Sequence, residues 1–566
     1  MEISGDSIEA QGMTTLFTFH GGIHPPGNKA QSTAHPIAPA PLPQELVIPL
    51  RQHAGEPAKP LVQIGERVLK GQLIGAPVGG FSAAIHAPTS GTISAIALKQ
   101  VAHPSALPEL CVVLAVDGRE EWAARDPVDY RALSGAELQA HLRAHGIVGL
   151  GGAAFPSDMK LRHAIPVETL ILNGAECEPY ISCDDMLMRE RADEIVRGVE
   201  ILRHALEARA VLIGIEDNKP EAIAAMQQAV QVSGLPFEVV AIPTLYPSGS
   251  AKQLIKILTG LEVPSGKLPT DIGVQCFNVG TACAIKRACD DGEPLLSRIV
   301  TVTGNVAHPR NYEALVGTRF AELVQLSKAL PDTDRYLMGG PMMGLELPAA
   351  DVPLVKASNC VIAASDALFP PKPAPLPCIR CTRCAQVCPA ELQPQDLYWF
   401  AQSNNFGKAQ EWNLFDCIEC GACAYVCPSS IPLVHYYRYA KSEIRARDQE
   451  KRAADQARER HEFHQLRIER EKQEKADRLA QKERENAAKA AAAPSAPAAS
   501  VDDTQQMRID AAIERAKAQT IAAQPKNTDH LTREQQAEIA AIEARRANLH
   551  KLAADAGADD EPPKQH

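Results

Sequence analysis

CIRCTRCAQVCP, residues 378–389, and CIECGACAYVCP, residues 417–428, are two copies of one cysteine pattern. In each copy three cysteines follow one another at intervals of three, and a fourth stands directly before a proline. The chain has 15 cysteines in 566 residues, and eight of them lie in these two stretches. The pattern predicts a compact metal-binding domain, which leaves the nature of the metal to be decided.

Disulfide bonds and zinc are the simpler interpretations of closely spaced cysteines. The N-terminus has neither a basic region nor an apolar region of the kind found in secretory signals, so we expect a cytoplasmic chain with reduced thiols. A closed zinc site with four cysteines usually takes them from two C-x-x-C pairs on separate knuckles. Three cysteines at intervals of three, followed by a fourth before proline, are instead typical of [4Fe–4S] ligation.

Two such motifs predict two clusters with exchanged ligands. In ferredoxins with two clusters, the fourth cysteine of each motif binds the cluster of the other motif. We therefore expect one [4Fe–4S] cluster on Cys378, Cys381, Cys384 and Cys427, and a second on Cys388, Cys417, Cys420 and Cys423. The residues between the motifs are long enough to form helical segments that return the chain to its starting point.

Upstream of the cysteines the chain is predicted to be an α/β multidomain protein. We expect a small β domain at 41–125, strand–helix alternation with a parallel sheet at 126–290, and a small α+β unit at 291–350. In the second of these, residues 185–208 are predicted to form one long amphipathic helix. An N-terminal segment, 1–40, precedes these domains; the two-cluster domain, 368–440, and a charged tail, 441–566, follow them.

The β domain resembles the barrel-sandwich hybrid of biotinyl and lipoyl carriers, in which a lysine at a hairpin tip carries the cofactor. Here the stretch from Pro77 to His86 contains no lysine, and Lys70 belongs to the preceding turn. We therefore expect a structural module rather than a swinging arm.

The tail is highly charged and lacks a sustained apolar seam, so we expect a solvated single helix or a disordered segment rather than a coiled coil. A linker at 490–500 and a second helix from the capping box Thr532–Gln535 are also predicted. The net charge of −11 argues against nucleic acid as a partner. No run of about 18 apolar residues predicts a membrane span.

A glycine-rich stretch, GLGGAA at 149–154, is a candidate ligand-binding loop. It matches G-x-G-x-x-A, but a predicted helix precedes it, whereas the dinucleotide fingerprint follows a strand. Unshielded N–H groups at Gly149, Gly151 and Gly152 would allow close approach of a phosphate or a ring, and Lys160 would add charge. A tight loop between domains explains the same residues equally well.

Polar residues lie at the end of one predicted strand and in the stretch FNVGTA. Open α/β sheets bind ligands beyond the carboxyl ends of their strands. Asn173, Glu176 and Glu178 follow the strand at 168–173, and Asn278 and Thr281 lie in FNVGTA. Ribityl or ribose hydroxyls, which donate hydrogen bonds, would suit the two carboxylates.

Together these motifs resemble a known family. FHGGIHPPGNK, GIVGLGGAAFP, NGAECEPYISCDDMLM, IGIEDNKPEA, QLIKILTG, NVGTACAIKRA and GGPMMG, with the two cysteine motifs, are similar to the RnfC component of the Rnf (Rsx) electron transport complex. The resemblance covers residues 15–440. The middle domain is similar in turn to the flavoprotein subunit of respiratory complex I, which binds FMN and NADH, and the unit at 291–350 is expected to be β-grasp-like.

The resemblance implies a peripheral subunit on the cytoplasmic side of the inner membrane. Electrons would pass from NADH through FMN and two [4Fe–4S] clusters to other subunits of the complex and a ferredoxin-like carrier, coupled to ion translocation. It places Gly149, Gly151, Gly152 and Lys160 in the flavin loop, and Asn173, Glu176, Glu178, Asn278 and Thr281 at flavin or nucleotide contacts. It assigns no catalytic residue.

Two positions depart from the family pattern. Ala251 stands where a glutamate is expected, and Ala154 stands where the loop usually has glycine. A flavin-free electron bridge or assembly subunit of the same kind of complex is therefore the alternative. A soluble diaphorase fused to a ferredoxin domain would use the same chemistry without a membrane.

Overall fold

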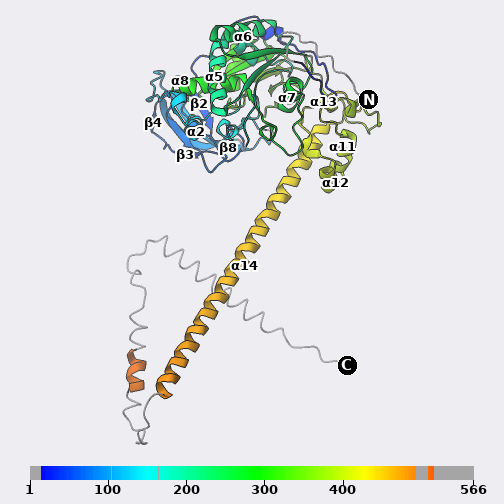
Figure 1. The fold of residues 1–566 in the computed structure, drawn as a ribbon. Helices are drawn as coiled ribbons and strands as arrows, with labels where there is room; N and C mark the ends of the chain where they lie inside the picture. Colours follow the sequence, from blue (N-terminus) through cyan, green and yellow to red (C-terminus); the bar gives the residue numbers. More distant parts are fainter. Residues whose placement is uncertain (1–14, 104, 163–164, 492–507, 516–566) are drawn as a thin grey trace, which may run out of the picture. The chain divides into compact units, whose positions relative to one another are not determined.

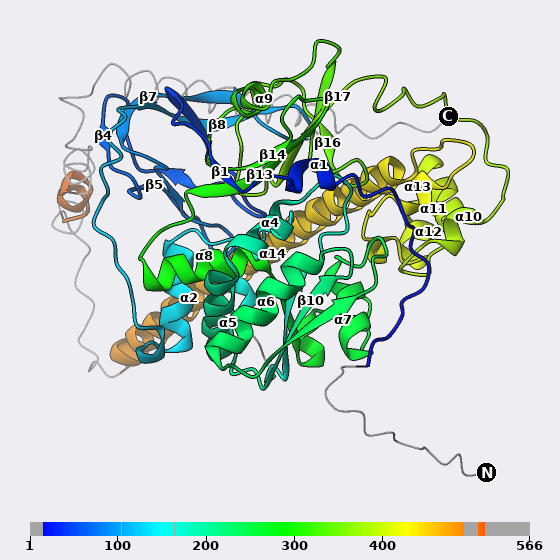
Figure 2. The ribbon, with the colours of Figure 1, turned by 90° about the horizontal axis from the view of Figure 1, so that it is seen from above.

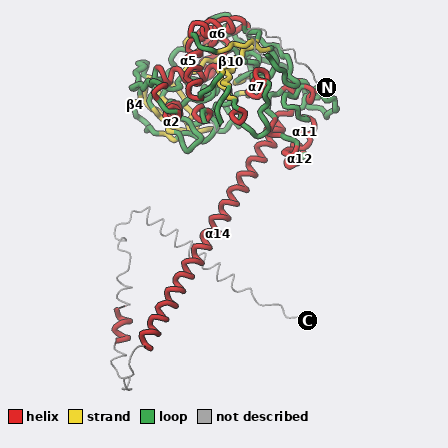
Figure 3. The backbone as a smooth tube through the Cα atoms, viewed as in Figure 1, coloured by secondary structure: helices red, strands yellow, loops and turns green. Residues whose placement is uncertain are grey.

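The computed structural model describes residues 15–103, 105–162, 165–491 and 508–515 (Figure 1). The chain forms two compact units, residues 1–455 and 456–566. The strands that the structure describes all belong to the first unit (Figure 3). The first 14 residues, the predicted linker beyond residue 491 and the predicted helix at Thr532 lie outside the described residues.

Residues 45–116 form two small antiparallel sheets that share one core. The strand orders are β2-β8-β7-β4 and β3-β5-β6. Leu46, Ile74, Ile93 and Leu114 from both sheets pack together and are buried. The strands are β2 (Glu45–Pro49), β3 (Lys59–Pro60), β4 (Arg67–Val68), β5 (Leu73–Ala76), β6 (Ile85–His86), β7 (Gly91–Gln100) and β8 (Pro108–Val116).

Lys70, the lysine nearest to the hairpin at 77–86, is engaged at the surface of this module. Its Nζ lies 2.8 Å from a carboxylate oxygen of Glu120 and 4.9 Å from the ring centroid of Trp122.

The next domain is built on a parallel sheet of order β11-β10-β9-β12. Successive residues of a strand face opposite sides of the sheet. Leu170 and Leu172 of β9 pack in a core shared with α5, α6 and α8, whereas Ile171 packs with residues of α7. In Figure 2, α5 and α6 lie on one side of β10 and α7 lies on the other. The elements are α2 (Gly135–Ala144), α3 (Ser157–Lys160), β9 (Thr169–Gly174), α4 (Cys183–Glu190), α5 (Ala192–Leu206), β10 (Ala210–Glu216), α6 (Pro220–Ser233), β11 (Phe237–Ile242), α7 (Ala251–Thr259), β12 (Val274–Asn278) and α8 (Val279–Asp290).

The prediction of a single helix over 185–208 is wrong. The chain leaves the helical conformation at Arg191, where φ is −137° and ψ is 37°, so α4 and α5 are separate helices. The Arg191 guanidinium forms an ion pair with Glu313 at 2.5 Å. This long-range contact has no signature in the local apolar periodicity, which continues through the break.

A six-stranded sheet of order β1-β14-β13-β17-β15-β16 follows the parallel sheet in the chain. Its first strand comes from the N-terminal segment and pairs in parallel with β14. The elements are α1 (Ala30–Thr33), β1 (Ala38–Pro39), β13 (Ser297–Gly304), β14 (Arg310–Leu315), α9 (Phe320–Leu326), β15 (Arg335–Met338), β16 (Leu345–Glu346) and β17 (Cys360–Ala364).

The two cysteine motifs lie among short helices around a small core. Between the motifs the chain forms α11 and α12, as predicted. The first turns of α14 complete this core with Leu433, Tyr437, Ala440 and Ile444. The helices are α10 (Arg383–Gln386), α11 (Pro394–Gln402), α12 (Phe406–Glu411), α13 (Ala422–Tyr425) and α14 (Leu433–Ala491).

In the second unit the described side chains of α14 are almost all exposed. The ion pairs Arg467–Glu471 and Arg470–Glu474 follow helical spacing along its surface. A charged helical tail was predicted, and the described residues 456–491 agree with it. Nowhere in the described part of the chain is a helix both long and apolar enough to cross a membrane.

Candidate functional site

A cavity lies at the carboxyl ends of β9 and β12, where the sequence predicts ligand binding. We call it the flavin cavity. Eight of the nine residues predicted to bind a cofactor line it, and Gly152 lies in the same loop without lining it. The eight residues are Gly149, Gly151, Lys160, Asn173, Glu176, Glu178, Asn278 and Thr281.

The glycine loop forms one wall of the flavin cavity and is tied down at its ends. The Gly149 N–H donates to the Phe155 carbonyl at 2.7 Å, and the buried hydroxyl of Thr281 accepts a hydrogen bond from the Leu150 N–H at 2.9 Å. A Cβ added to Gly152 would meet no atom within 4 Å, and one on Gly149 would come no closer than 3.5 Å. The loop therefore leaves room for a group to approach its backbone, as a bound flavin requires.

Lys160 lies half-buried against the same cavity, without a carboxylate partner among the described residues. Its ammonium donates to the Cys276 carbonyl at 2.7 Å and lies 4.9 Å from the ring centroid of Phe277. Burial lowers the pKa of this lysine. A partly buried cation whose contacts among the described residues are a carbonyl and a ring suits an anionic ligand group, such as the phosphate of FMN.

Glu176 and Glu178 use their carboxylates to organise the walls. Glu176 accepts a hydrogen bond from the Asp184 N–H at 2.9 Å, at the N-terminus of α4. Glu178 accepts from the N–H groups of Met342 and Met343, at 2.7 and 3.0 Å. The glutamates thus bind the chain's own backbone, and each carboxylate keeps further lone pairs for a ligand hydroxyl.

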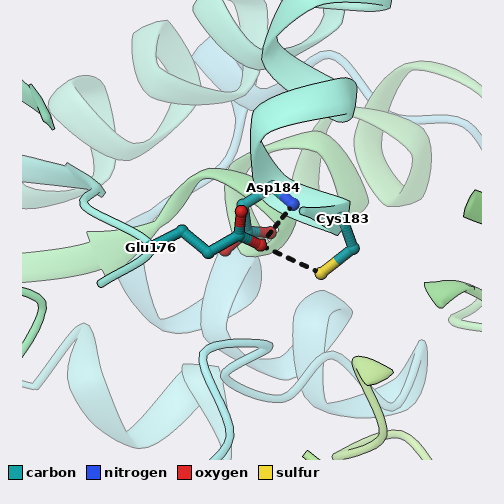
Figure 4. Close-up of side chains that lie close together, drawn as sticks. All are labelled: Glu176, Cys183 and Asp184. Carbon is teal, nitrogen blue, oxygen red and sulfur yellow. Dashed lines mark hydrogen bonds between the residues drawn. The ribbon is translucent and has the colours of Figure 1, made fainter. Parts of the chain in front are cut away.

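Asp184 is a site residue that the sequence analysis did not name. Figure 4 shows it beside Glu176 and Cys183. One carboxylate oxygen of each acid and the Cys183 Sγ all lie within 4.8 Å of one another. The Asn278 amide donates to the Asp184 carboxylate at 2.6 Å. Burial, together with the negative charge of Glu176, raises the pKa of Asp184 to about 7.

The eight motif cysteines line two separate cavities. The first, cage 1, is lined by Cys378, Cys381, Cys384 and Cys427, and the second, cage 2, by Cys388, Cys417, Cys420 and Cys423. Each cage takes three cysteines from one motif and the fourth from the other. All 15 cysteines are free thiols. Four converging thiols fit an iron–sulfur cluster, whose irons bind thiolates; the assignment of each ligand stays a prediction.

Cage 2 adjoins the flavin cavity. Cys420 lines both cavities, together with its neighbour Ile418. The Tyr246 hydroxyl, also in the wall of the flavin cavity, donates to the Cys420 carbonyl at 2.5 Å. In cage 1, by contrast, Cys381 is exposed. Cage 2 is thus the inner cage, and cage 1 reaches the surface.

Residues 17–29, which we call the N-terminal strap, join the two regions. The Gly22 N–H donates to the Val387 carbonyl at 3.1 Å, beside the fourth cysteine of the first motif. Ile23 exchanges two backbone hydrogen bonds with Tyr246, at 2.9 and 3.0 Å. The strap therefore contacts the wall of the flavin cavity and the cysteine domain at once.

Comparison with known proteins identifies the family, whose members are named as the C component of an ion-translocating oxidoreductase complex. The relative from Serratia proteamaculans (strain 568) is 51% identical over 79% of this chain and 64% of its own length, so the match spans less than two thirds of that protein. The relative from Yersinia pestis bv. Antiqua (strain Antiqua) is 50% identical over 79% of this chain and 72% of its own length. This chain belongs to that family.

Four family models match separate parts of the chain. They are the RnfC barrel sandwich hybrid domain (residues 17–119), the Nuo51 FMN-binding domain (142–287), the SLBB domain (299–346) and the 4Fe-4S dicluster domain (377–431). These matches confirm the predicted fold class and the predicted FMN and [4Fe–4S] cofactors. Among solved structures, an NAD+-reducing [NiFe]-hydrogenase aligns with a TM-score of 0.40 and 18% identity, over 55% of this chain and 62% of its own.

The two departures from the family pattern differ in their position. Ala154 is buried in the hydrophobic core, has a φ of +45° and does not line the flavin cavity. Its carbonyl accepts a hydrogen bond from the Ala54 N–H of the β module at 3.1 Å. Ala251 does line the cavity, at the first turn of α7. Only Ala251 therefore changes the surface that a ligand would meet.

Tyr246 and Cys177 also line the flavin cavity and were missed. Tyr246 stands in LYPSG, after the third strand of the sheet, where the carboxyl-end rule alone would have pointed. Cys177 stands between the two glutamates, outside the two cysteine motifs. The carboxyl ends of the strands thus indicated where the site lies, but a tyrosine and a cysteine there gave no chemical reason to select them as site residues.

Proposed function

We propose that this chain passes electrons between NADH and other subunits of an ion-translocating oxidoreductase complex. NADH would reduce FMN in the flavin cavity, and electrons would leave through cage 2 and then cage 1. FMN supplies the conversion between a two-electron hydride donor and one-electron carriers. The observation that carries this order is the shared wall at Cys420, because it makes cage 2 the immediate neighbour of the flavin cavity.

The residues that line the flavin cavity support separate roles. Lys160 would bind the FMN phosphate, the glycine loop would approach the ring or the phosphate, and Thr281 would hold that loop in place through Leu150. Asn173 is held by the Gly249 carbonyl, to which its amide donates at 2.9 Å, so its position does not depend on the ligand. We also propose the domain boundaries that the sequence predicts, with the flavin cavity in the domain at 126–290 and the cages in the domain at 368–440.

The partners and location are proposed from the family. The relatives are named as components of an ion-translocating complex. We propose that the chain is a peripheral subunit on the cytoplasmic side of the inner membrane, and that it exchanges electrons with partner subunits and a ferredoxin-like carrier. The exposed Cys381 of cage 1 supports an exit at that surface.

A flavin-free electron bridge remains the second candidate, and Ala251 is the observation that favours it. The family's glutamate would stand in the cavity wall, and its loss would weaken ligand binding by roughly 1–3 kcal/mol if a buried polar group were left unpaired. Lys160 and the open glycine loop favour the first candidate.

Visible absorption spectra distinguish the FMN-dependent NADH-oxidising subunit from the flavin-free electron bridge. The chain is purified anaerobically, supplied with FMN, and its visible absorption is recorded before and after NADH. Bleaching of flavin and cluster absorption is expected. Iron near eight atoms per chain, with no bound flavin and no bleaching, would exclude NADH oxidation in favour of the bridge.

A further inference from the structure

A second cavity adjoins the flavin cavity, and one residue lines both of them. This inner cavity lies among α4, α8, β13 and the segment that precedes β13. Among the described residues Asp184 is the only one that lines both cavities. Asp184 is therefore the contact point between the space where a flavin fits and a mainly apolar space. The other charged side chains that line this space are Arg191, Arg287, Arg298, Glu293 and Glu313.

The proposed electron route requires a route for a proton. Oxidation of NADH to NAD+ gives two electrons and one proton. Each [4Fe–4S] cluster accepts one electron and no proton, so the balanced change is NADH plus two oxidised clusters to NAD+, one proton and two reduced clusters. The proton must leave the cavity by another way, and in the reverse direction it must enter.

We propose that Asp184 accepts this proton and passes it into the inner cavity toward Glu293. The proposal rests on the proposed function for the source of the proton. Glu293 suits the outer end of the route because it lines the inner cavity and is partly exposed to solvent. Burial also raises the pKa of Glu293, which favours its protonation.

The other carboxylates of the flavin cavity are less suited to this role. Glu178 is bound by two backbone N–H groups of the loop at 342–343 and does not line the inner cavity. Glu176 caps α4 and does not line the inner cavity either. Only Asp184 has access to both sides.

The groups around Asp184 poise it for proton transfer. It faces Glu176 after β9, Arg298 from β13 and Lys29 from the strap, and Asn278 donates a hydrogen bond to it. Burial and Glu176 outweigh the two cations, and the pKa of Asp184 is about 7. A group with this pKa is partly ionised at neutral pH, as efficient acid–base transfer requires. Its proton-accepting form increases as the pH rises through about 7.

The test follows proton release directly. Holoprotein loaded with FMN and clusters is reduced with dithionite, freed of excess reductant and reoxidised with ferricyanide in the presence of a pH-indicator dye. NADH is absent, so the result does not depend on NADH oxidation. Wild type should release protons at a rate that rises with pH through about 7. Asp184→Asn should slow release on the order of 100-fold and abolish that rise.

Two further variants and a static measurement keep the test decisive. Asp193→Asn, on the exposed surface of α5, should behave as wild type. Glu293→Gln should slow release while an infrared carboxyl band that titrates near pH 7 persists; that band should be missing in Asp184→Asn. A rate of proton release in Asp184→Asn equal to that of wild type would overturn the proposal. If Asp184→Asn does not bind FMN, a rate in Glu293→Gln equal to that of wild type would overturn it instead. If wild type does not oxidise NADH but its proton release still depends on Asp184, the proposed function is overturned and the proton route is not.

Discussion

At the scale of single residues, Thr281 shows how the flavin cavity is held open. Its hydroxyl lies in the core and accepts a hydrogen bond from the Leu150 N–H, so it fixes the glycine loop from behind. Thr281→Val keeps the side-chain shape but leaves a buried N–H unsatisfied, which should cost about 1–3 kcal/mol of unfolding free energy. FMN affinity should fall as well.

Thr281→Ser is the matched control, because it keeps the hydroxyl and removes only a methyl group. Chemical denaturation and FMN titration by fluorescence would compare both variants with wild type. Equal FMN affinity in wild type and Thr281→Val would show that this hydrogen bond does not shape the loop.

The sequence predicted the cavity residues better than the roles they play. Asn173 and the two glutamates were selected because they lie at the end of a predicted strand, Asn278 because it lies in FNVGTA, and all four line the cavity. Asp184 was missed because it follows a loop and starts a helix, and only the folded chain brings it between two cavities. The importance of Asp184 depends on burial beside Glu176, which no local pattern encodes.

At the scale of elements, the N-terminal strap is one of the contacts between the cysteine domain and the wall of the flavin cavity. Gly21 has a φ of +74°, and a Cβ there would lie 2.6 Å from the Val387 carbonyl carbon. Gly21→Ala should therefore cost roughly 2 kcal/mol and loosen the cysteine domain. The thermal unfolding temperature and the rate of electron transfer from flavin to clusters should both be lower than in wild type.

Gly27→Ala provides the control within the same strap. A Cβ at Gly27 would meet no atom within 4 Å, so both measurements should match wild type. A normal transfer rate in Gly21→Ala would mean that the strap does not position cage 2.

Elements with local signals were predicted well, and those that depend on long-range contacts were not. The strand predicted at 168–173 follows an apolar run, and the structure has β9 at Thr169–Gly174. The break at Arg191 and the pairing of β1 with β14 depend on residues more than 100 positions away. The exchange of ligands between the motifs stays a prediction from their spacing, with which the cysteines that line each cage are consistent.

At the scale of the whole molecule, the domains should differ in their dependence on iron. The core around the cages contains several of the motif cysteines, whereas the core between the parallel sheet and α5, α6 and α8 contains none of them. Anaerobic removal of iron should therefore abolish amide-exchange protection in residues 378–431, because such a cage folds around its metal. Protection of β9–β12 should persist. Unchanged protection at 378–431 would show that the cysteine domain folds without its clusters.

The central claim is that electrons from the flavin cavity enter cage 2 before cage 1. The most direct test compares Cys388→Ser, which should lose the cage 2 cluster, with Cys427→Ser, which should lose the cage 1 cluster. Each variant is loaded with FMN, mixed with NADH, frozen within milliseconds and examined by electron paramagnetic resonance. We expect Cys427→Ser to show a rapidly reduced cluster and Cys388→Ser to keep its remaining cluster oxidised on that timescale. Equally fast reduction of the remaining cluster in Cys388→Ser would contradict the account.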